Sequence, residues 1–271
     1  MNCEICNFKN PKATTTAIII QDNKILLLKR NEEPFLGKWD LPGGYMNENE
    51  TPEESLKREM KEELNINSAN LTFIKALPGK ASWKNEEFPI LSHFFLTEIN
   101  GDIKLNQENN EYQFVSLKSV NASDIAFDSN QNMIAWLKEN FTFDMVRVKE
   151  LINQLDSSTV VNEQSLYKAM LNGFLSKIYD GEKLIGLGWI FPRQTLSRRQ
   201  AIVEDMIVDK EYRGKGYGAK MLLELIDWSK KNGMDMIELT SNPVTRLAAN
   251  KLYEKYGFKL HPTNHYLYKV E

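Results

Sequence analysis

The chain has 271 residues, of which 42% are hydrophobic and 26% charged, and its net charge is −3. This composition excludes a disordered protein, and the length favours two domains over one. Residues 1–143 carry 15 Lys and Arg against 21 Asp and Glu, whereas residues 144–271 carry 19 against 16. Neither half is basic enough to predict nucleic-acid binding from charge alone. The positive excess of the second half would suit an anionic cofactor, although solvated surface charge explains it equally well.

The N-terminal residues show no basic start and no apolar core of a secretion signal. The longest apolar runs are far too short to span a bilayer. We therefore expect a soluble cytoplasmic protein without a membrane partner. The two cysteines form Cys3-x-x-Cys6, which is half of a zinc ribbon without a second pair. A relic knuckle or free thiols are expected rather than bound metal, and a zinc shared between two chains is kept as an alternative.

The first half begins with a β-hairpin signal and continues with a helix start. Two aliphatic runs, 13–20 and 25–29, are separated by Gln21-Asp22-Asn23. Further on, Thr51 and Glu54 make a capping box, and Pro52 suits the first helical turn. Later segments predict strands at 71–76, 90–98 and 112–117 and a closing helix at 133–140.

The second half starts a new pattern, which places the domain boundary within 141–146. We predict one domain at 1–143 and another at 144–271. The expected order in the second domain is helices at 148–155 and 163–171, strands at 175–179, 184–191 and 201–208, a helix at 217–231, a strand at 236–240, a helix at 245–256 and a last strand at 266–270.

The helix that starts at Pro52 carries an unusual set of carboxylates. At about 100° per residue, its Leu, Met and Leu at 56, 60 and 64 form an apolar stripe, and Glu59, Glu62 and Glu63 project together beside it. Neighbouring like charges on an exposed helix repel by about 0.2–0.5 kcal/mol per pair. A hard divalent cation would reverse that sign, and oxygen ligands favour Mg²⁺ or Mn²⁺. A solvated acidic face is the alternative for the helix taken alone.

The wider spacing favours the metal site. Gly44, five residues, Glu50 and seven further residues precede Arg58-Glu59-Met60-Lys61-Glu62-Glu63-Leu64-Asn65-Ile66. This pattern over 23 residues resembles the Nudix hydrolase family. The resemblance implies an α/β/α sandwich with a mixed sheet, and it makes Glu59 and Glu62 catalytic as well as metal-binding. It further implies Glu63 and the Gly43 carbonyl as metal ligands, with Arg58 and Glu50 as orienting partners.

Two positions qualify this assignment. Glu111 lies where many members of the family place a further metal-binding carboxylate, and an exposed strand-edge Glu is an equal alternative. Asn65 stands where the family pattern has its last glycine. Because Asn tolerates the left-handed conformation better than other non-glycine residues, the change should leave the metal site intact.

A glycine-rich turn marks the second half. It reads Arg213-Gly214-Lys215-Gly216-Tyr217-Gly218, between a predicted strand and a predicted amphipathic helix. Such a turn can aim backbone N–H groups at an anion bound at the helix N-terminus. A dinucleotide-binding turn would follow its strand at once, whereas residues 209–212 intervene here.

A second motif follows this turn. It reads Ala249-x-x-Leu252-Tyr253-Glu254-Lys255-x-Gly257-Phe258, and Arg246 lies seven residues before Tyr253. The turn and this motif together resemble the GNAT acyltransferases. The resemblance implies a twisted, mostly antiparallel sheet flanked by helices, with the turn residues 213–218 binding the pyrophosphate of acetyl-CoA. It implies that the backbones of Met206 and Val208 bind the pantetheine arm. It also makes Tyr253 the general acid, with Glu204 or Asp205 as the base, although Tyr253 could instead serve packing.

The sequence thus predicts a bifunctional α/β (α+β) enzyme. One site would split a nucleoside diphosphate linked to another group, with Mg²⁺ or Mn²⁺. The other would transfer an acetyl group from acetyl-CoA to a small amine or a peptide. The alternative is a regulatory sensor that binds nucleotide and acyl-CoA without turnover at one or both sites. The nucleotide, the amine and the oligomeric state are left open.

Overall fold

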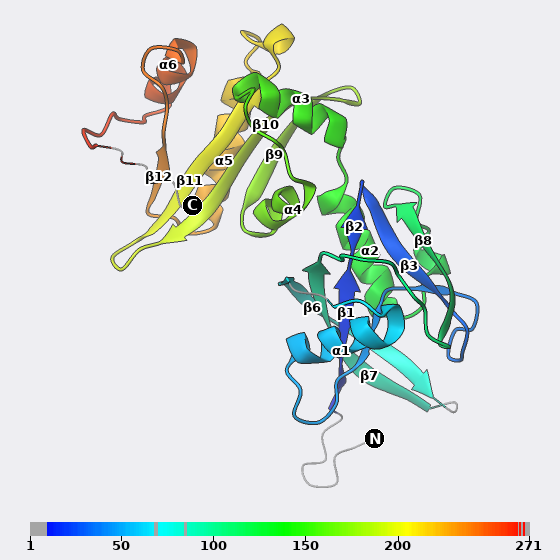
Figure 1. The fold of residues 1–271 in the computed structure, drawn as a ribbon. Helices are drawn as coiled ribbons and strands as arrows, with labels where there is room; N and C mark the ends of the chain where they lie inside the picture. Colours follow the sequence, from blue (N-terminus) through cyan, green and yellow to red (C-terminus); the bar gives the residue numbers. More distant parts are fainter. Residues whose placement is uncertain (1–9, 68–69, 84–85, 265, 267, 269–271) are drawn as a thin grey trace. The chain divides into compact units, whose positions relative to one another are not determined.

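A computed structural model describes residues 10–67, 70–83, 86–264, 266 and 268. The chain divides into two compact units, and Figure 1 shows their elements in chain order. The first unit comprises residues 1–145 and 162–171, and the second comprises 146–161 and 172–271. The Cys3–Cys6 pair lies outside the described residues, as does most of the strand expected at 266–270.

The first unit is built on two sheets. One has the strand order β5-β1-β7-β6 and is mixed, because β1 runs parallel to β7 and antiparallel to β5. The other is antiparallel, with the order β2-β3-β4 and with β8 also paired to β3. The strands are β1 (Lys12–Ile18), β2 (Ile20–Gln21), β3 (Lys24–Arg30), β4 (Trp39–Asp40), β5 (Gly43–Tyr45), β6 (Leu71–Trp83), β7 (Glu86–Thr97) and β8 (Asn109–Ser116).

Helices cover both faces of the mixed sheet (Figure 1). Alternate residues of β1 point to opposite faces. Thr15 lies 3.2 Å from the Ser55 hydroxyl of α1 (Pro52–Leu64). Its neighbour Thr14 donates to Ser92, which donates in turn to Ser129 of α2 (Asp128–Phe141). The expected α/β/α sandwich with a mixed sheet is therefore confirmed.

The turn between β2 and β3 is bound by a helix from far along the chain. Asp22 and Asn23 both have left-handed backbones, with φ of 50° and 59°. Their two N–H groups donate to the carboxylate of Glu163, at 2.9 and 2.8 Å. Glu163 begins α4 (Glu163–Leu171), so this helix belongs to the first unit.

Apolar packing holds α4 more strongly than these polar contacts. Tyr167 is fully buried, and its ring stacks on Phe141 at 4.9 Å and lies 5.6 Å from Phe143. Its hydroxyl donates to Glu163 and Asn23. The helix around Tyr167 was correctly predicted, but its attachment to the first unit was not foreseen from the sequence.

The second unit contains one four-stranded sheet with the order β12-β11-β10-β9. Only β11 and β12 run parallel, so the sheet is mostly antiparallel, as expected. The elements are α3 (Met145–Leu155), β9 (Phe174–Asp180), β10 (Lys183–Gln194), β11 (Arg199–Val208), α5 (Tyr217–Lys231), β12 (Met236–Leu239) and α6 (Leu247–Lys255). A short 3-10 turn, η2 (Lys210–Tyr212), follows β11, and another, η1 (Ala122–Asp124), belongs to the first unit.

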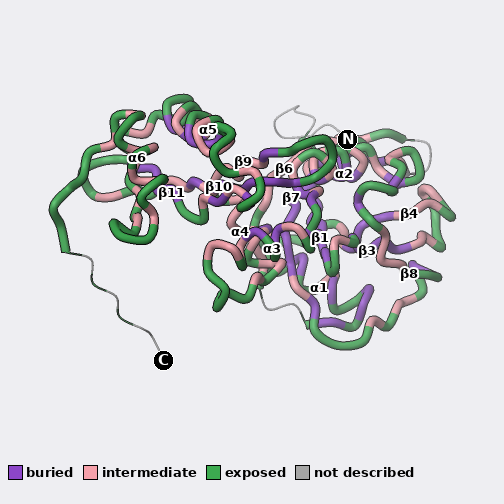
Figure 2. The backbone as a smooth tube through the Cα atoms, turned by 90° about the horizontal axis from the view of Figure 1, so that it is seen from above, coloured by how far each residue is buried: buried purple, intermediate pink, exposed green. Residues whose placement is uncertain are grey.

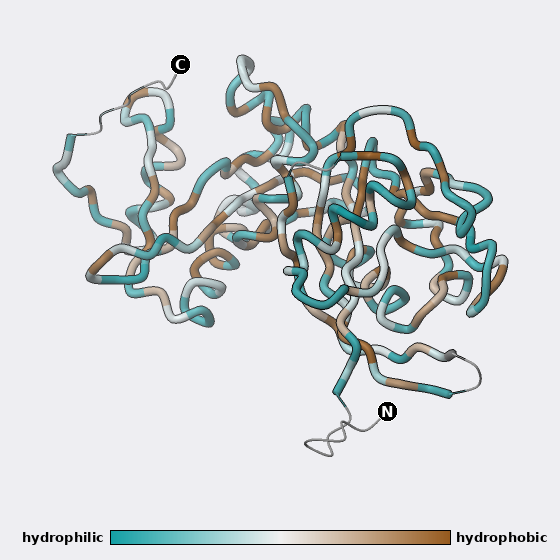
Figure 3. Tube along the Cα trace, turned by 60° about the horizontal axis from the view of Figure 1, so that its bottom comes forward, coloured by the Kyte–Doolittle hydropathy of each residue, from teal (hydrophilic) through white to brown (hydrophobic). Residues whose placement is uncertain are grey.

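Close packing of α5 on this sheet depends on two glycines of β10. A Cβ on Gly186 would lie 2.8 Å from Met221 Cε, and one on Gly188 would lie 2.6 Å from Met221 Sδ. Met221, Leu222 and Leu225 are fully buried as a result. In Figure 2 the inner side of α5 and the central strands carry the buried colour. Figure 3 shows hydrophobic and hydrophilic stretches alternating along the chain.

We predict that Tyr167→Ala destabilises the first unit by about 3–5 kcal/mol, because it empties a fully buried aromatic site. Hydrogen exchange measured on the full chain should show faster exchange in β2, β3 and α2, with β9–β11 unchanged. Tyr179→Ala removes an exposed ring from β9 and serves as the matched control. Equal destabilisation by the two variants would show that α4 does not support the first unit.

Candidate active sites

The carboxylate helix starts and ends as its sequence predicts. The Thr51 hydroxyl accepts from the N–H of Glu54, and the Glu54 carboxylate accepts from the N–H of Thr51, which completes the capping box. The helix ends at Asn65, whose φ of 55° and ψ of 33° are left-handed. Leu56, Met60 and Leu64 are fully buried, so the carboxylates are held on the adjoining face.

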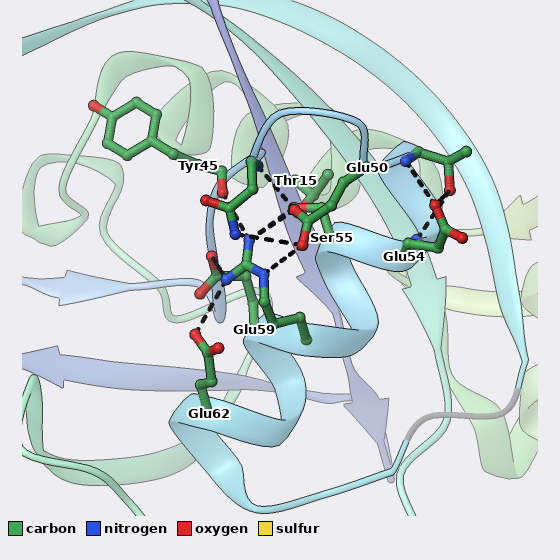
Figure 4. A network of polar contacts seen from close by, with 10 residues as sticks. Thr15, Tyr45, Glu50, Glu54, Ser55, Glu59 and Glu62 are labelled. Carbon is green, nitrogen blue, oxygen red and sulfur yellow. Dashed lines mark hydrogen bonds and ion pairs between the residues drawn. The ribbon is translucent and has the colours of Figure 1, made fainter.

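One guanidinium links the carboxylates of this face (Figure 4). Arg58 donates from Nη1 to Glu59 at 2.7 Å and to Glu62 at 3.1 Å. It also donates to both carboxylate oxygens of Glu50, at 2.7 and 3.0 Å, and to the carbonyl of Tyr45. A single cationic nitrogen therefore lies between the first two expected metal ligands. The orienting role that the sequence suggested for Arg58 and Glu50 fits these contacts.

The third carboxylate of the set is buried. Glu63 is only 7% exposed and accepts from the N–H of Gly43 at 2.8 Å and from Asn109 at 3.3 Å. Burial raises the pKa of Glu63 well above its usual value, and the charges of Glu59, Asp40 and Glu108 add to that effect. The sequence analysis predicted Gly43 and Glu63 as ligands of one metal site, and in the structure the two residues are in direct contact.

Gly43 has no room for a side chain. Its φ is 144°, and a Cβ there would lie 2.0 Å from the backbone carbonyl oxygen of Thr15 in β1. At Gly44 a Cβ would lie 2.5 Å from Glu59 Oε1, so the Glu59 carboxylate would have to move.

The fourth carboxylate near the helix is Glu108, which the sequence analysis missed. Burial raises the pKa of Glu59, and the charges of Glu62 and Glu108 raise it further. Glu111 instead pairs with Lys29 at 3.2 Å across β3 and β8. The two glutamates lie three residues apart at the start of β8, so spacing alone does not distinguish them. The neighbouring Asn109, which bonds to Glu63, could have drawn attention to this end of the strand.

The donor set suits a hard divalent cation. Carboxylates and a backbone carbonyl are the ligands that Mg²⁺ prefers. Within the part of the chain that the structure describes, no three His, Cys, Asp or Glu side chains are already arranged around one point. The Arg58 nitrogen stands between Glu59 and Glu62 instead, and it marks a position where these residues stabilise positive charge.

The second candidate site begins beyond the end of the parallel pairing of β11 with β12. β11 pairs with β12 only from Gln200 to Val203, although β11 continues to Val208. The pairing with β10 is interrupted by a bulge between Leu187 and Trp189, opposite which Asp205 has φ of 51°. The backbone of Met206 and Val208 thus lies beyond the paired part of β12. That position fits the pantetheine contacts expected from the family resemblance.

The glycine-rich turn follows β11 after Asp209 and η2. Arg213 Nε donates to the Val208 carbonyl at 3.0 Å. Gly214 and Gly216 have φ of 76° and 86°, and Gly216 is the N-cap of α5. Open space surrounds both glycines, so their conformations rather than crowding require the absence of a side chain. The first N–H groups of α5 are therefore directed out of the turn toward any anion bound there.

The remaining residues of the turn are close to other basic and aromatic groups. Lys215 Nζ lies 4.9 Å from the ring centre of Tyr212, and Lys183 Nζ lies 5.2 Å from it. Tyr217 has its ring 6.3 Å from that of Tyr212. Gly218 faces α6, where Leu252 Cδ2 is 3.5 Å from the position a Cβ would take. The turn and α6 are thus neighbours.

Tyr253 projects from α6, beside Phe258 at 5.9 Å between ring centres. Partial burial raises its pKa, whereas the nearby Arg246 acts to lower it. Glu204 is exposed and lies opposite Trp189 in the β10–β11 register. Desolvation raises the pKa of its neighbour Asp205. The acid and base roles of these residues stay predictions.

The described helices contain none that is long and apolar enough to cross a membrane. Residues 11–137 match the model of the NUDIX domain, and residues 131–258 match that of the acetyltransferase (GNAT) family. The first half of the chain therefore belongs to the NUDIX family, and the second half is similar to the GNAT family. The chain is an enzyme.

Known proteins are similar to each half of the chain. The ADP-ribose pyrophosphatase of Methanocaldococcus jannaschii is 36% identical over 124 residues, which cover 45% of this chain and 70% of that protein. The N-acetyltransferase YobR of Bacillus subtilis, itself uncharacterised, is 33% identical over 34% of this chain and 36% of its own length. A solved NUDIX hydrolase from Nitrosomonas europaea is 27% identical, covers 51% of this chain and 77% of its own, and has a TM-score of 0.40.

The ion pair of Glu50 predicts a dependence of stability on pH. The hydrogen bonds from Arg58 lower the pKa of Glu50 from 4.5 to about 2. A depressed carboxyl pKa contributes stability above the unfolded value, and this contribution is lost as pH falls through the folded value. Wild type should therefore be more stable than Glu50→Gln at pH 6, and the difference should shrink between pH 4.5 and pH 2. Urea unfolding across this range measures it, and a difference that persists at pH 2 would contradict the assignment.

Proposed function

We propose that the first unit hydrolyses the pyrophosphate bond of a nucleoside diphosphate linked to another group, with Mg²⁺ or Mn²⁺. ADP-ribose is the first substrate to test, because a relative that shares 36% identity is named as an ADP-ribose pyrophosphatase. Water would add to one phosphorus, the bridging P–O bond would break, and AMP and ribose 5-phosphate would result. The observation that carries this proposal is the convergence of Glu59, Glu62 and buried Glu63 around Arg58 and Gly43.

The metal ligands proposed are Glu59, Glu62, Glu63 and the Gly43 carbonyl. A bound divalent ion would neutralise the phosphate charge and lower the pKa of a bound water. Glu108 is added as a candidate ligand because its charge acts on both Glu59 and Glu63. Arg58 would hold Glu59 in position while the substrate binds. Glu111 is retained as the alternative ligand that the sequence suggested.

For the second unit, we propose acetyl transfer from acetyl-CoA to a primary amine on a small molecule or peptide. The amine nitrogen would attack the thioester carbonyl, and the C–S bond would break. Tyr253 would give its proton to the departing thiolate, and Glu204 or Asp205 would accept the amine proton. The part of β11 that extends beyond β12, followed by a turn with left-handed glycines, supports this proposal. Arg213, Gly214, Lys215, Gly216, Tyr217 and Gly218 would surround the pyrophosphate.

A regulatory sensor is the competing function. Such a protein would bind ADP-ribose and acetyl-CoA without turnover at one or both sites. The complete set of Glu59, Glu62 and Glu63 favours hydrolysis, because a sensor has no need of all three carboxylates. Calorimetry with each ligand, followed by product analysis, separates binding from turnover. Binding of both ligands without any product would establish the sensor.

We predict that Glu62→Gln and Glu63→Gln lower ADP-ribose hydrolysis at least about 100-fold in limiting Mg²⁺, because each removes a charged metal ligand. Glu108→Gln and Glu111→Gln form a matched pair three residues apart. Glu108→Gln should lower turnover about 10- to 100-fold, and Glu111→Gln should have a smaller effect. Phosphate release assays coupled to a phosphatase measure all four. If Glu111→Gln loses more turnover than Glu108→Gln, Glu111 and not Glu108 is the fourth metal ligand.

We predict that Gly216→Ala weakens acetyl-CoA binding at least about tenfold, because alanine opposes the left-handed turn that directs N–H groups at the pyrophosphate. Gly233→Ala is the matched control, since Gly233 also has a positive φ and open space around it, at the other end of α5. Tyr253→Phe should keep acetyl-CoA affinity but slow transfer. Calorimetry and thiol release measure these outcomes, and equal affinities in the two glycine variants would exclude the turn as the site.

A further inference from the structure

The helix α3 makes a series of polar contacts at the entrance to the glycine turn. Arg147, near its start, donates from Nη2 to Asp209, from Nε to the Leu184 carbonyl at 3.0 Å, and from Nη1 to Glu150 at 2.5 Å. Asp209 directly follows β11 and its side chain is only 5% exposed. A buried carboxylate needs such a partner, and this Arg lowers the pKa of Asp209.

Asp209 in turn sets the direction of the chain as it leaves the sheet. Its N–H donates to the Ile185 carbonyl at 2.8 Å, so its backbone stays attached to β10. Its side chain accepts from the N–H of Glu211 at 3.1 Å, and its carbonyl accepts from the N–H of Tyr212. These contacts form η2, the short 3-10 turn that directly precedes Arg213. The position of the glycine turn therefore depends on the orientation of one carboxylate.

The far end of α3 reaches both the turn and α6. Gln154 Oε1 accepts from the N–H of Lys210 at 2.9 Å. One residue later, the Leu155 carbonyl accepts from Arg246 Nη2, also at 2.9 Å. Arg246 is the N-cap residue of α6, the helix that carries Tyr253. A cation at this carbonyl is also favoured by the dipole at the C-terminus of α3.

We propose that α3 is a brace that positions the two sides of the acyl-CoA site relative to each other. Arg147 holds the glycine turn through Asp209, and Arg246 holds α6 against the last carbonyl of the same helix. Both arginines are positioning residues and neither needs to touch the cofactor. The proposal rests on acetyl-CoA binding at the glycine turn, as proposed above, and it adds Arg147 and Asp209, which lie outside the motifs that indicate that binding.

The brace supplies contacts beyond the end of the parallel strand pair. β12 ends at Leu239, the partner of Val203, so it gives no backbone hydrogen bonds to the rest of β11. Side chains of α3 instead hold the chain that follows β11. The three contacts of Arg147 with Asp209, Glu150 and a carbonyl give it one fixed geometry, which Lys cannot reproduce.

The test measures acetyl-CoA binding by calorimetry on the full chain, at a temperature where circular dichroism shows each variant folded. Arg147→Gln and Arg246→Gln should each weaken acetyl-CoA binding at least about tenfold, as expected for the loss of charge-assisted hydrogen bonds. Arg147→Lys should restore only part of the loss. Arg193→Gln is the matched control, because Arg193 bonds to Gln200 and Glu238 in the same unit. Its affinity should equal that of wild type.

A double-mutant cycle tests whether Arg147 acts through Asp209. If it does, Arg147→Gln with Asp209→Asn should bind acetyl-CoA no more weakly than Arg147→Gln alone. Additive losses, or unchanged affinity in Arg147→Gln and Arg246→Gln despite lower melting temperatures, would overturn the brace. Failure of wild type to bind acetyl-CoA would refute the proposed acyltransferase site itself, and with it the brace. The two failures are therefore distinguishable.

Discussion

The need to hold several negative charges together at partly buried positions governs the first unit. The carboxylates of Glu59, Glu62 and Glu63 repel one another, and this repulsion is stronger where water is excluded. Arg58, the Gly43 N–H and Asn109 offset that cost. The same contacts fix α1 against β5. A site that concentrates charge in this way is prepared for a cationic metal and a polyanionic substrate.

In the second unit, the chain beyond the parallel strand pair is positioned by other contacts. The pairing of β11 with β12 ends at Val203, and the residues after β11 rely on side chains from α3 and on the left-handed turn at Gly214 and Gly216. The buried pair of Arg147 and Asp209 is costly to desolvate, and its value here is conformational specificity rather than stability. In both units, then, arginine side chains organise backbone that secondary structure alone leaves undefined.

Local features were predictable from the sequence wherever the determining residues are close together in the chain. The capping box at Thr51, the left-handed Asn65 and the bounds of α5 all follow from a few adjacent residues, and the structure confirms them. The attachment of α4 was not predictable, because Glu163 binds backbone N–H groups some 140 residues away. Glu108 was missed for a related reason: its proximity to Glu59 depends on strand register, which spacing does not encode.

The path of the chain between the two units has a consequence for how the protein is made. The chain leaves the first unit after residue 145, returns at residue 162 and leaves again after residue 171. On the ribosome, the first unit therefore cannot bury Phe141 and Phe143 against Tyr167 until that part of α4 has emerged from the exit tunnel. By then the first helix of the second unit has already been synthesised. A fragment that ends near residue 143 would therefore lack α4 and leave Phe141 and Phe143 without their contact to Tyr167.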